Sequence, residues 1–205
     1  MKRNKLRLIG LTGGIATGKS TVSNMLIDKG YAVIDSDKIS REVVEPQKPA
    51  YNKITQEFGK SIINEDKTIN RKALGKLIFN DDQARKKLNS IIHPYILNQT
   101  LKIIGDLSKS NDIIFLDIPL LFEEYQLFTE YGIEFDEIWL IYTTRNTQIK
   151  RLMDRDKISK EEALKKIAAQ IDINEKKTRS SKIIDNGGDL RELKLKIEKA
   201  LNEII

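Results

Sequence analysis

The sequence predicts an α/β fold in which a five-stranded parallel sheet is covered by helices on both faces. Five short runs are almost uniformly apolar, and longer amphipathic segments separate them. These runs cover residues 6–11, 31–35, 113–117, 137–143 and 182–186. A strand with one face in water alternates apolar and polar residues, and these runs do not. Helices must therefore lie against both faces, which gives three layers.

The helices next to the first and last strands have clear boundaries. After residue 19, apolar residues recur at helical spacing until Gly30, which can end a helix. After the last run, Asp189 and Glu192 form the start signal of a final helix. That helix carries an apolar stripe of Leu193, Ile197, Ala200, Leu201 and Ile204.

Two helical segments interrupt the alternation of strands and helices. The first, about 46–110, has three groups at helical spacing, which follow Asn70, Asp81 or Asp82, and Pro94. The second, about 145–179, contains a capping box of Ser159 and Glu162. We expect one domain over residues 1–205. Its core covers about 1–45, 111–144 and 180–205, and the two segments form a helical insertion and a lid.

Composition excludes several classes of protein. The chain has 205 residues, 40% of them hydrophobic, which suits one compact domain. Cysteine is absent, so disulfide and thiolate chemistry are excluded. No run of about 18 apolar residues predicts a membrane span. The basic start, MKRNKLRLIG, has too short an apolar part for a signal peptide, and we expect a cytoplasmic protein.

The positive charge is concentrated in one segment. The net charge is +6, and residues 145–182 hold 12 basic and 6 acidic side chains, so the remaining residues are neutral in sum. A neutral body with one basic segment suits a polyanionic ligand. There is no aromatic-rich stacking surface, and we expect no nucleic-acid partner. The alternative is a solvated charged helix face.

A phosphate-binding motif lies between the first strand and the first helix. Residues 10–22 read GLTGGIATGKSTV, which contains G-x-x-x-x-G-K-[ST]. In this motif backbone N–H groups ring the phosphates at a positive helix N-terminus. We expect Lys19 to reach the β- and γ-phosphates and Ser20 to hold Mg²⁺. The sequence therefore predicts a nucleotide site and leaves the acceptor of the phosphoryl group open.

Acidic residues follow the second strand in the stretch DSDKISR. Ligands of open α/β sheets bind beyond the carboxyl ends of the strands, so we expect Asp35 and Asp37 near the phosphate loop. A carboxylate there can orient an attacking hydroxyl and accept its proton. Arg41 lies one helical turn after Asp37 and can contact a phosphate. The alternative is that Asp35 or Ser36 only caps the next helix.

Three further residues are candidates for the functional site, and for two of them a purely structural role is the alternative. Asp117 ends the third strand and is a candidate to bind Mg²⁺ through water. Leu120, in the stretch LDIPLLFE, either walls the substrate or belongs to the core. His93, the only histidine, either contacts substrate or has a structural role at a helix end before Pro94.

Seven blocks in order resemble the dephospho-coenzyme A kinases over nearly the whole chain: LTGGIATGKSTV, VIDSDKISREVV, RKALGKLIF, LNSIIHPYI, DIPLLFE, QIKRLMDRD and IIDNGG. The resemblance implies a P-loop kinase fold with a helical coenzyme-A-binding insertion and a lid. It implies ATP-dependent phosphorylation of the ribose 3′-hydroxyl of dephospho-CoA, the last step of coenzyme A synthesis. Two departures occur: Ser36 stands where the family has Ala, and Ser180-Ser181 stands where it has Ala-Asp.

The resemblance also assigns roles to individual residues. Asp37 resembles the catalytic base, and Lys19 and Arg151 resemble catalytic cations. Arg155 resembles a second lid arginine at the nucleotide, and Arg41 and His93 match acceptor-side residues, with Leu120 beside them. The ATP-binding loop would comprise Gly13, Gly14, Ile15, Ala16, Thr17, Gly18, Lys19, Ser20 and Thr21.

We therefore expect an enzyme that uses ATP and Mg²⁺ on dephospho-CoA and acts as a monomer. The alternatives are a nucleoside or nucleotide kinase and a regulatory GTPase. A GTPase carries an N-K-x-D motif, and here Asn52-Lys53 is followed by Ile54-Thr55.

Overall fold

A computed structural model describes residues 6–79 and 81–204 of the chain. The basic start at residues 1–5 lies outside the described residues, as do Asn80 and Ile205. The chain divides into two compact units. We call Met1–Ile34 with Leu107–Ile205 the core unit, and Asp35–Asp106 the helical unit. The division into core, insertion and lid that the sequence suggests stays a prediction.

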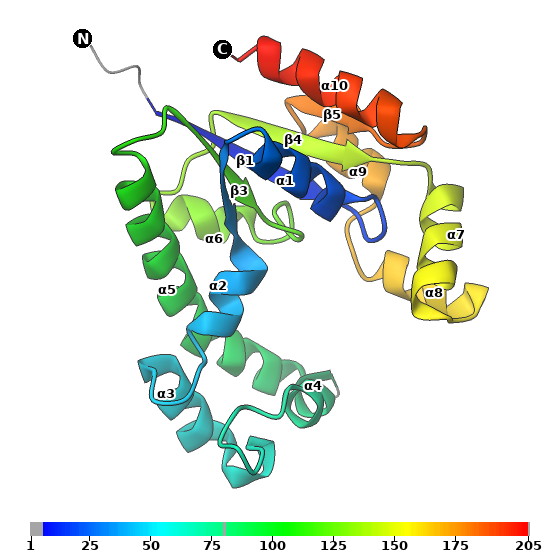
Figure 1. Cartoon of the computed structure of the whole chain (residues 1–205). Coiled ribbons are helices and arrows are strands. Elements are labelled where there is room, and N and C mark those ends of the chain that lie inside the picture. Colours follow the sequence, from blue (N-terminus) through cyan, green and yellow to red (C-terminus); the bar gives the residue numbers. More distant parts are fainter. Residues whose placement is uncertain (1–5, 80, 205) are drawn as a thin grey trace. The chain divides into compact units, whose positions relative to one another are not determined.

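The five expected strands form one parallel sheet, so the predicted fold class is confirmed (Figure 1). The strands are β1 (Arg7–Gly13), β2 (Ala32–Asp35), β3 (Ile113–Asp117), β4 (Glu137–Tyr142) and β5 (Lys182–Asp185). Their order is β2-β3-β1-β4-β5. From β1 the chain moves to one side of the sheet and from β3 to the other. This reversal beside β1 is where open α/β sheets bind ligands.

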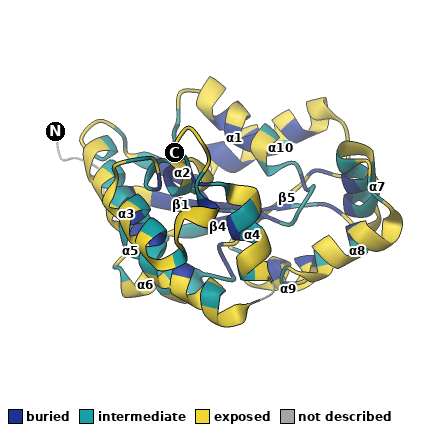
Figure 2. Ribbon diagram, turned by 90° about the horizontal axis from the view of Figure 1, so that it is seen from below, coloured by how far each residue is buried: buried dark blue, intermediate teal, exposed yellow. Residues whose placement is uncertain are grey.

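One face of the sheet is buried by the first and last helices. These are α1 (Lys19–Asp28) and α10 (Leu190–Asn202). Ile9 and Leu11 of β1 pack with Trp139 of β4 in this core. The expected apolar stripe is buried here: Leu193, Ile197, Ala200 and Leu201 lie on α10, and Ile204 lies just after its end at Asn202. Figure 2 shows α1 and α10 side by side, each with a buried and an exposed face.

The opposite face of β1 is covered by the chain that follows β3. A Cβ on Gly10 would lie 2.8 Å from Leu121 Cδ2 and 3.0 Å from Phe135 Cδ1. A short helix, α6 (Tyr125–Glu130), adds Phe128, whose ring stands 6.0 Å from that of Phe135. The apolar chain thus approaches the β1 backbone closely, and Gly10 is the residue that permits it.

Three helices form the basic segment after β4. They are α7 (Arg145–Asp156), α8 (Lys160–Ala168) and α9 (Ile173–Thr178). The predicted capping box at the start of α8 is present: Ser159 Oγ accepts the Glu162 N–H at 3.2 Å, and Glu162 accepts the Ser159 N–H at 3.0 Å. Asp189 caps α10 by accepting the Glu192 N–H at 2.8 Å.

The helical unit has its own apolar core. Its elements are α2 (Ser36–Glu42), α3 (Pro49–Phe58), the 3₁₀ turn η1 (Lys60–Ile62), α4 (Arg71–Phe79) and α5 (Asp82–Leu107). The core contains Ala50, Ile54, Ile62 and Leu88. Asn70 and Asp81 cap α4 and α5 through their side-chain oxygens.

The expected break at Pro94 is wrong. We expected one helix to end at His93 and another to begin after Pro94, but α5 runs through this position for 26 residues. Proline removes one backbone hydrogen bond and crowds the preceding turn. Leu88 on one side of Pro94 and Leu97 on the other are both buried. Packing of both halves therefore outweighs the local cost of the proline.

None of the helices among the described residues is long and apolar enough to cross a membrane.

Candidate active site

The phosphate-binding loop takes the conformation that its motif predicts. It leaves the buried strand β1 and enters α1, which begins at Lys19. Ala16 (φ 61°) and Gly18 (φ 90°) lie in the left-handed region. At Gly18 a Cβ would also collide with the side chain of Asn186. Glycine is therefore needed at this position both for the backbone angle and for the neighbouring amide.

Thr17 ties the loop to itself and to the residue that follows β5. Its side chain is buried, and its Oγ1 donates to the Gly14 carbonyl at 2.9 Å. Its own carbonyl accepts from Asn186 Nδ2 at 2.8 Å. Asn186 follows β5, so the loop is held from the end of a second strand.

Lys19, Asp117 and Ser23 form a polar cluster at the carboxyl ends of β1 and β3. The Lys19 ammonium pairs with Asp117 Oδ1, and Ser23 Oγ donates to Asp117 Oδ2. The Asp117 side chain is 7% exposed, and that of Lys19 is 18% exposed. Asp117 lies opposite Leu11 in the β1–β3 register. The sheet therefore fixes the acid beside the phosphate loop.

Asp35 and Asp37 have different surroundings. Asp35 Oδ1 accepts the Lys38 N–H at 3.0 Å, which makes Asp35 the N-cap of α2. Asp37 lies in the first turn of α2 and is exposed. Within the described residues no hydrogen bond or ion pair holds its carboxylate. Asp35 therefore has the helix-capping role that was the alternative to a catalytic one. The Asp37 carboxylate is available to a ligand.

The other acceptor-side candidates in the helical unit differ in exposure. Arg41 is exposed in the last turn of α2. His93 is half-buried within α5, and this burial lowers its pKa from the ordinary value of 6.5. Its ring is therefore mostly uncharged at neutral pH.

Leu120 differs from its neighbours in the core unit. Leu121 and Phe122 are buried, at 0% and 5% exposure, whereas Leu120 is 37% exposed. Leu120 is thus the residue of the three that can touch a ligand.

The two expected lid arginines are both on α7 but make different contacts. Arg151 donates from Nη2 to the Asn186 carbonyl at 2.9 Å and from Nη1 to the Thr17 carbonyl at 3.5 Å. It therefore reaches the phosphate loop. Arg155 is exposed and donates from Nε to Asp156 Oδ1 at 2.7 Å. This bond raises the pKa of Arg155.

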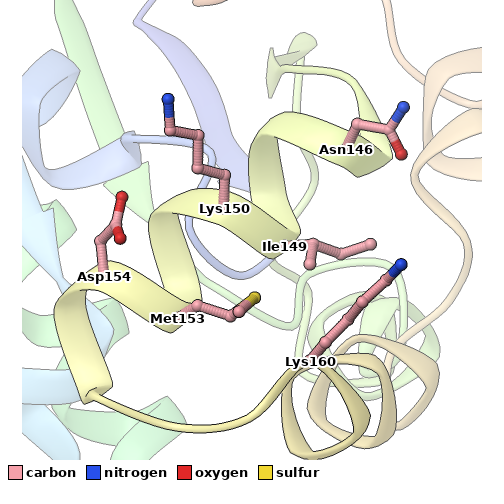
Figure 3. Close-up of a pocket in the computed structure, with 6 residues that line it drawn as sticks. All are labelled: Asn146, Ile149, Lys150, Met153, Asp154 and Lys160. Atoms are coloured by element: carbon pink, nitrogen blue, oxygen red, sulfur yellow. The ribbon is translucent and has the colours of Figure 1, made fainter.

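A cavity on α7 lies on the side away from the loop. It has a volume of about 270 Å³ and is shown in Figure 3. Its lining is Asn146, Ile149, Lys150, Met153, Asp154 and Lys160. At 100° per residue the α7 members of this set occupy the face opposite Gln148 and Arg151. The cavity is therefore not part of the phosphate site.

The sequence did not predict several residues that contact or support the phosphate loop. Gln148 and Gln170 bond to the backbone of Ile15, and Asn186 bonds to that of Thr17. Glu123 accepts from Lys176, which is fully buried. Gln148, Asn186 and Glu123 lie in three of the sequence blocks that resemble the family. Hydrophobic periodicity, however, cannot predict contacts between segments so far apart in the sequence.

Comparison with known proteins gives one consistent result. The sequence model of a family described as dephospho-CoA kinase matches residues 7–192. A dephospho-CoA kinase of Oceanobacillus iheyensis is 44% identical over 198 residues, which cover 96% of each chain. One of Carboxydothermus hydrogenoformans is 46% identical over 186 residues, which cover 90% of this chain and 88% of that protein.

Solved structures agree with the sequence comparison. A dephospho-CoA kinase from Campylobacter jejuni matches with a TM-score of 0.71 and 32% identity, over 96% of each chain. A protein from Thermus thermophilus matches with a TM-score of 0.82 and 28% identity, over 98% of this chain and all of that one. A shikimate kinase from Acinetobacter baumannii, at 17% identity and a TM-score of 0.53 over 97% of this chain and 93% of that one, shares the fold alone.

Proposed function

The chain belongs to the dephospho-CoA kinase family, whose reaction is the phosphorylation of dephospho-CoA in the last step of coenzyme A biosynthesis, and we propose that residues 13–21 hold the ATP phosphates for it. The activity is therefore that of an ATP-dependent kinase. The relatives named above by activity at 30% identity or more are all dephospho-CoA kinases, so none of them supports the alternative of a nucleoside or nucleotide kinase. The proposals below concern which residues do the work.

The main support for the ATP site comes from the backbone N–H groups at the start of α1. The first N–H groups of a helix have no partner within it. Among the described residues the N–H groups of Gly18, Lys19 and Ser20 donate to no protein acceptor. They lie at the positive end of the helix dipole, beside the Lys19 ammonium. This combination favours the β- and γ-phosphates of ATP.

Mg²⁺ suits the oxygen donors at the same place. Ser20 is exposed in the first turn of α1, and Asp117 supplies a carboxylate next to the loop. Both Asp117 oxygens already accept from Lys19 and Ser23. We propose that Ser20 binds the ion directly and that Asp117 holds one of its waters. When bound, Mg²⁺ neutralises charge that develops on the phosphates.

The acceptor groups lie in the helical unit. We propose that Asp37 accepts a hydrogen bond from the ribose 3′-hydroxyl and so orients its oxygen toward the γ-phosphorus. As that oxygen bonds to phosphorus, the bond to the β–γ bridging oxygen breaks and ADP leaves. Little charge builds on the attacking oxygen early in a loose transition state, so Asp37 takes the proton late. Lys19 and Arg151 supply positive charge to the transferring group.

A cavity of about 340 Å³ in the helical unit supports its role as the acceptor-binding insertion. It starts at Glu42 and Val43, which follow Arg41 at the end of α2. Its other lining residues are Lys48, Pro49, Tyr95, Asn98, Gln99 and Lys102. Apolar walls with two amides, two ammonium groups and one carboxylate, that of Glu42, suit an arm that carries phosphates, amides and methyl groups. We propose that Arg41, His93 and this cavity bind the non-reacting part of dephospho-CoA, and that Leu120 lines the substrate.

We also propose that the enzyme is cytoplasmic and a monomer. Size-exclusion chromatography with light scattering tests the monomeric state. The function itself is tested by ATP consumption with a panel of acceptors: dephospho-CoA, AMP, adenosine and shikimate, each with Mg²⁺ and with EDTA. We expect turnover with dephospho-CoA that EDTA abolishes. Turnover with AMP or adenosine and none with dephospho-CoA would show that the acceptor is assigned wrongly.

A further inference from the structure

Two glutamines hold both backbone polar groups of Ile15 in the phosphate loop. Gln170 Oε1 accepts the Ile15 N–H at 2.8 Å. Gln148 Nε2 donates to the Ile15 carbonyl at 2.7 Å. Gln148 lies on α7, and Gln170 lies between α8 and α9. At Ile15, which lies between Gly13 and Gly18 of the motif, residues 145–179 therefore bond to the phosphate loop through neutral side chains.

The amide of Gln148 can have only one orientation here. Its side chain is 1% exposed, and a Cβ on Gly14 would lie 2.6 Å from its Nε2. Turning the amide over would place Oε1 against the Ile15 carbonyl, so that two acceptors would face each other. The buried Oε1 has no hydrogen-bond partner among the described residues, which is a cost that the structure accepts at this site.

Gln170 is held in place by the residue that follows it. The Ile171 N–H donates to Glu123 Oε1 at 3.0 Å. The Lys176 ammonium, which is fully buried, pairs with the same Glu123 carboxylate at 2.8 Å. Breaking this ion pair would leave the buried Lys176 charge uncompensated, so the contacts of Glu123 with Ile171 and Lys176 resist rearrangement. Glu123 lies six residues after Asp117. These contacts therefore link the segment that carries Gln170 to the chain that leaves β3.

We propose that Gln170 is a positioning residue for phosphoryl transfer: its Oε1 fixes the Ile15 N–H and with it the first half of the phosphate loop. The inference rests on the proposed role of this loop in binding ATP. A glutamine accepts this N–H without adding negative charge beside the phosphates. A glutamate would also accept it, but its charge would repel the nucleotide.

Two variants separate the hydrogen bond from the charge. Gln170→Met removes the acceptor and keeps the length of the side chain, whereas Gln170→Glu keeps the acceptor and adds a charge. The matched control is Gln126→Met on α6, where the glutamine side chain donates to the nearby Glu130. Steady-state kinetics with ATP and dephospho-CoA, the Kd of MgATP, and hydrogen exchange of residues 13–18 are measured for each protein.

The two variants should fail in different ways. We expect Gln170→Met to lower kcat about three- to tenfold, the scale of one neutral hydrogen bond, and to speed exchange in residues 13–18. We expect Gln170→Glu to keep wild-type exchange and kcat but to raise the KM for ATP, with a rise that shrinks in added salt. The proposal would be overturned if both variants matched the Gln126→Met control. It would also be overturned if both variants lost kcat equally while hydrogen exchange of residues 13–18 stayed unchanged.

Failure of this inference is distinguishable from failure of the proposed function. A wild-type protein that binds MgATP but does not phosphorylate dephospho-CoA contradicts the function. The exchange and Kd measurements would still decide the role of Gln170, because they need no acceptor.

Discussion

Lys19, the first residue of α1, and Asp117, the last residue of β3, form an ion pair at the carboxyl edge of the sheet. Ser23, one turn along α1, donates to the other oxygen of the same carboxylate. The pair joins the phosphate loop to the strand that lies beside β1. In the proposed site, this contact holds the lysine that acts on the transferring phosphoryl group beside the acid that binds a metal-bound water.

Replacement of Lys19 by alanine should remove the charge that acts on the transferring group. We expect Lys19→Ala to lower kcat by about 10²- to 10⁴-fold, the scale of losing one electrostatic contact to the transition state. The measurement is steady-state turnover with saturating ATP and dephospho-CoA.

The control for this variant is Lys29→Ala. Lys29 pairs with Glu198 on the surface, and such pairs contribute little to stability. Circular dichroism melting curves should show that both variants fold. A folded Lys19→Ala protein with a near-normal rate would contradict the assignment of the phosphate loop.

Arg151 should be sensitive even to replacement by lysine. Its guanidinium reaches two carbonyl oxygens at once, of Asn186 and Thr17, and a single ammonium cannot reproduce this planar fork. We expect Arg151→Lys to lower kcat more than it weakens MgATP binding. The two quantities are measured by steady-state kinetics and isothermal titration calorimetry.

Ligand should also protect the lid. If residues 145–179 close over ATP, MgATP will slow hydrogen exchange across α7 and α8. If they form only a solvated charged face, Arg151→Lys will stay within about twofold of wild type, under 0.5 kcal/mol of activation free energy. That outcome together with unchanged exchange would retire the lid assignment.

His93 gives a pH-dependent test, because it is the only histidine of the chain. Burial lowers its pKa from 6.5, so the unfolded chain binds the proton more tightly than the folded chain does. The free energy of unfolding should therefore fall as pH drops through 6.5, relative to the variant His93→Gln. Nuclear magnetic resonance titration of the single imidazole gives the pKa directly. A value at or above 6.5 would contradict this account.

The fold could be predicted from sequence because its signals are local. The five apolar runs and the caps at Ser159 and Asp189 each depend on a few adjacent residues, and the structure contains all of them. Pro94 shows where local signals fail. Its backbone cost is visible in the sequence, while the packing that outweighs it comes from residues of the helical core.

The candidate site was predictable only in part for the same reason. The phosphate loop is one continuous motif, so its geometry follows from spacing. The bond from Gln170 to Ile15 joins residues 155 positions apart, and the bond from Asn186 to Thr17 joins residues 169 apart. Sequence periodicity contains no information about such pairs. The structure also separated Asp35, a helix cap, from Asp37, which spacing alone left unresolved.

The proposed role of Asp37 is to orient the 3′-hydroxyl of dephospho-CoA for transfer from ATP. Asp37→Asn keeps the size and removes the charge, and Asp35→Asn retains a good N-cap because asparagine caps about as well as aspartate. The decisive measurement is single-turnover transfer of labelled γ-phosphate to dephospho-CoA by wild type and both variants, with the MgATP Kd of each. The account predicts label on the 3′-oxygen, a near-normal rate for Asp35→Asn, and for Asp37→Asn a rate at least about 10²-fold lower with unchanged MgATP affinity. A larger loss in Asp35→Asn than in Asp37→Asn, or no transfer to the 3′-oxygen by wild type, would contradict it.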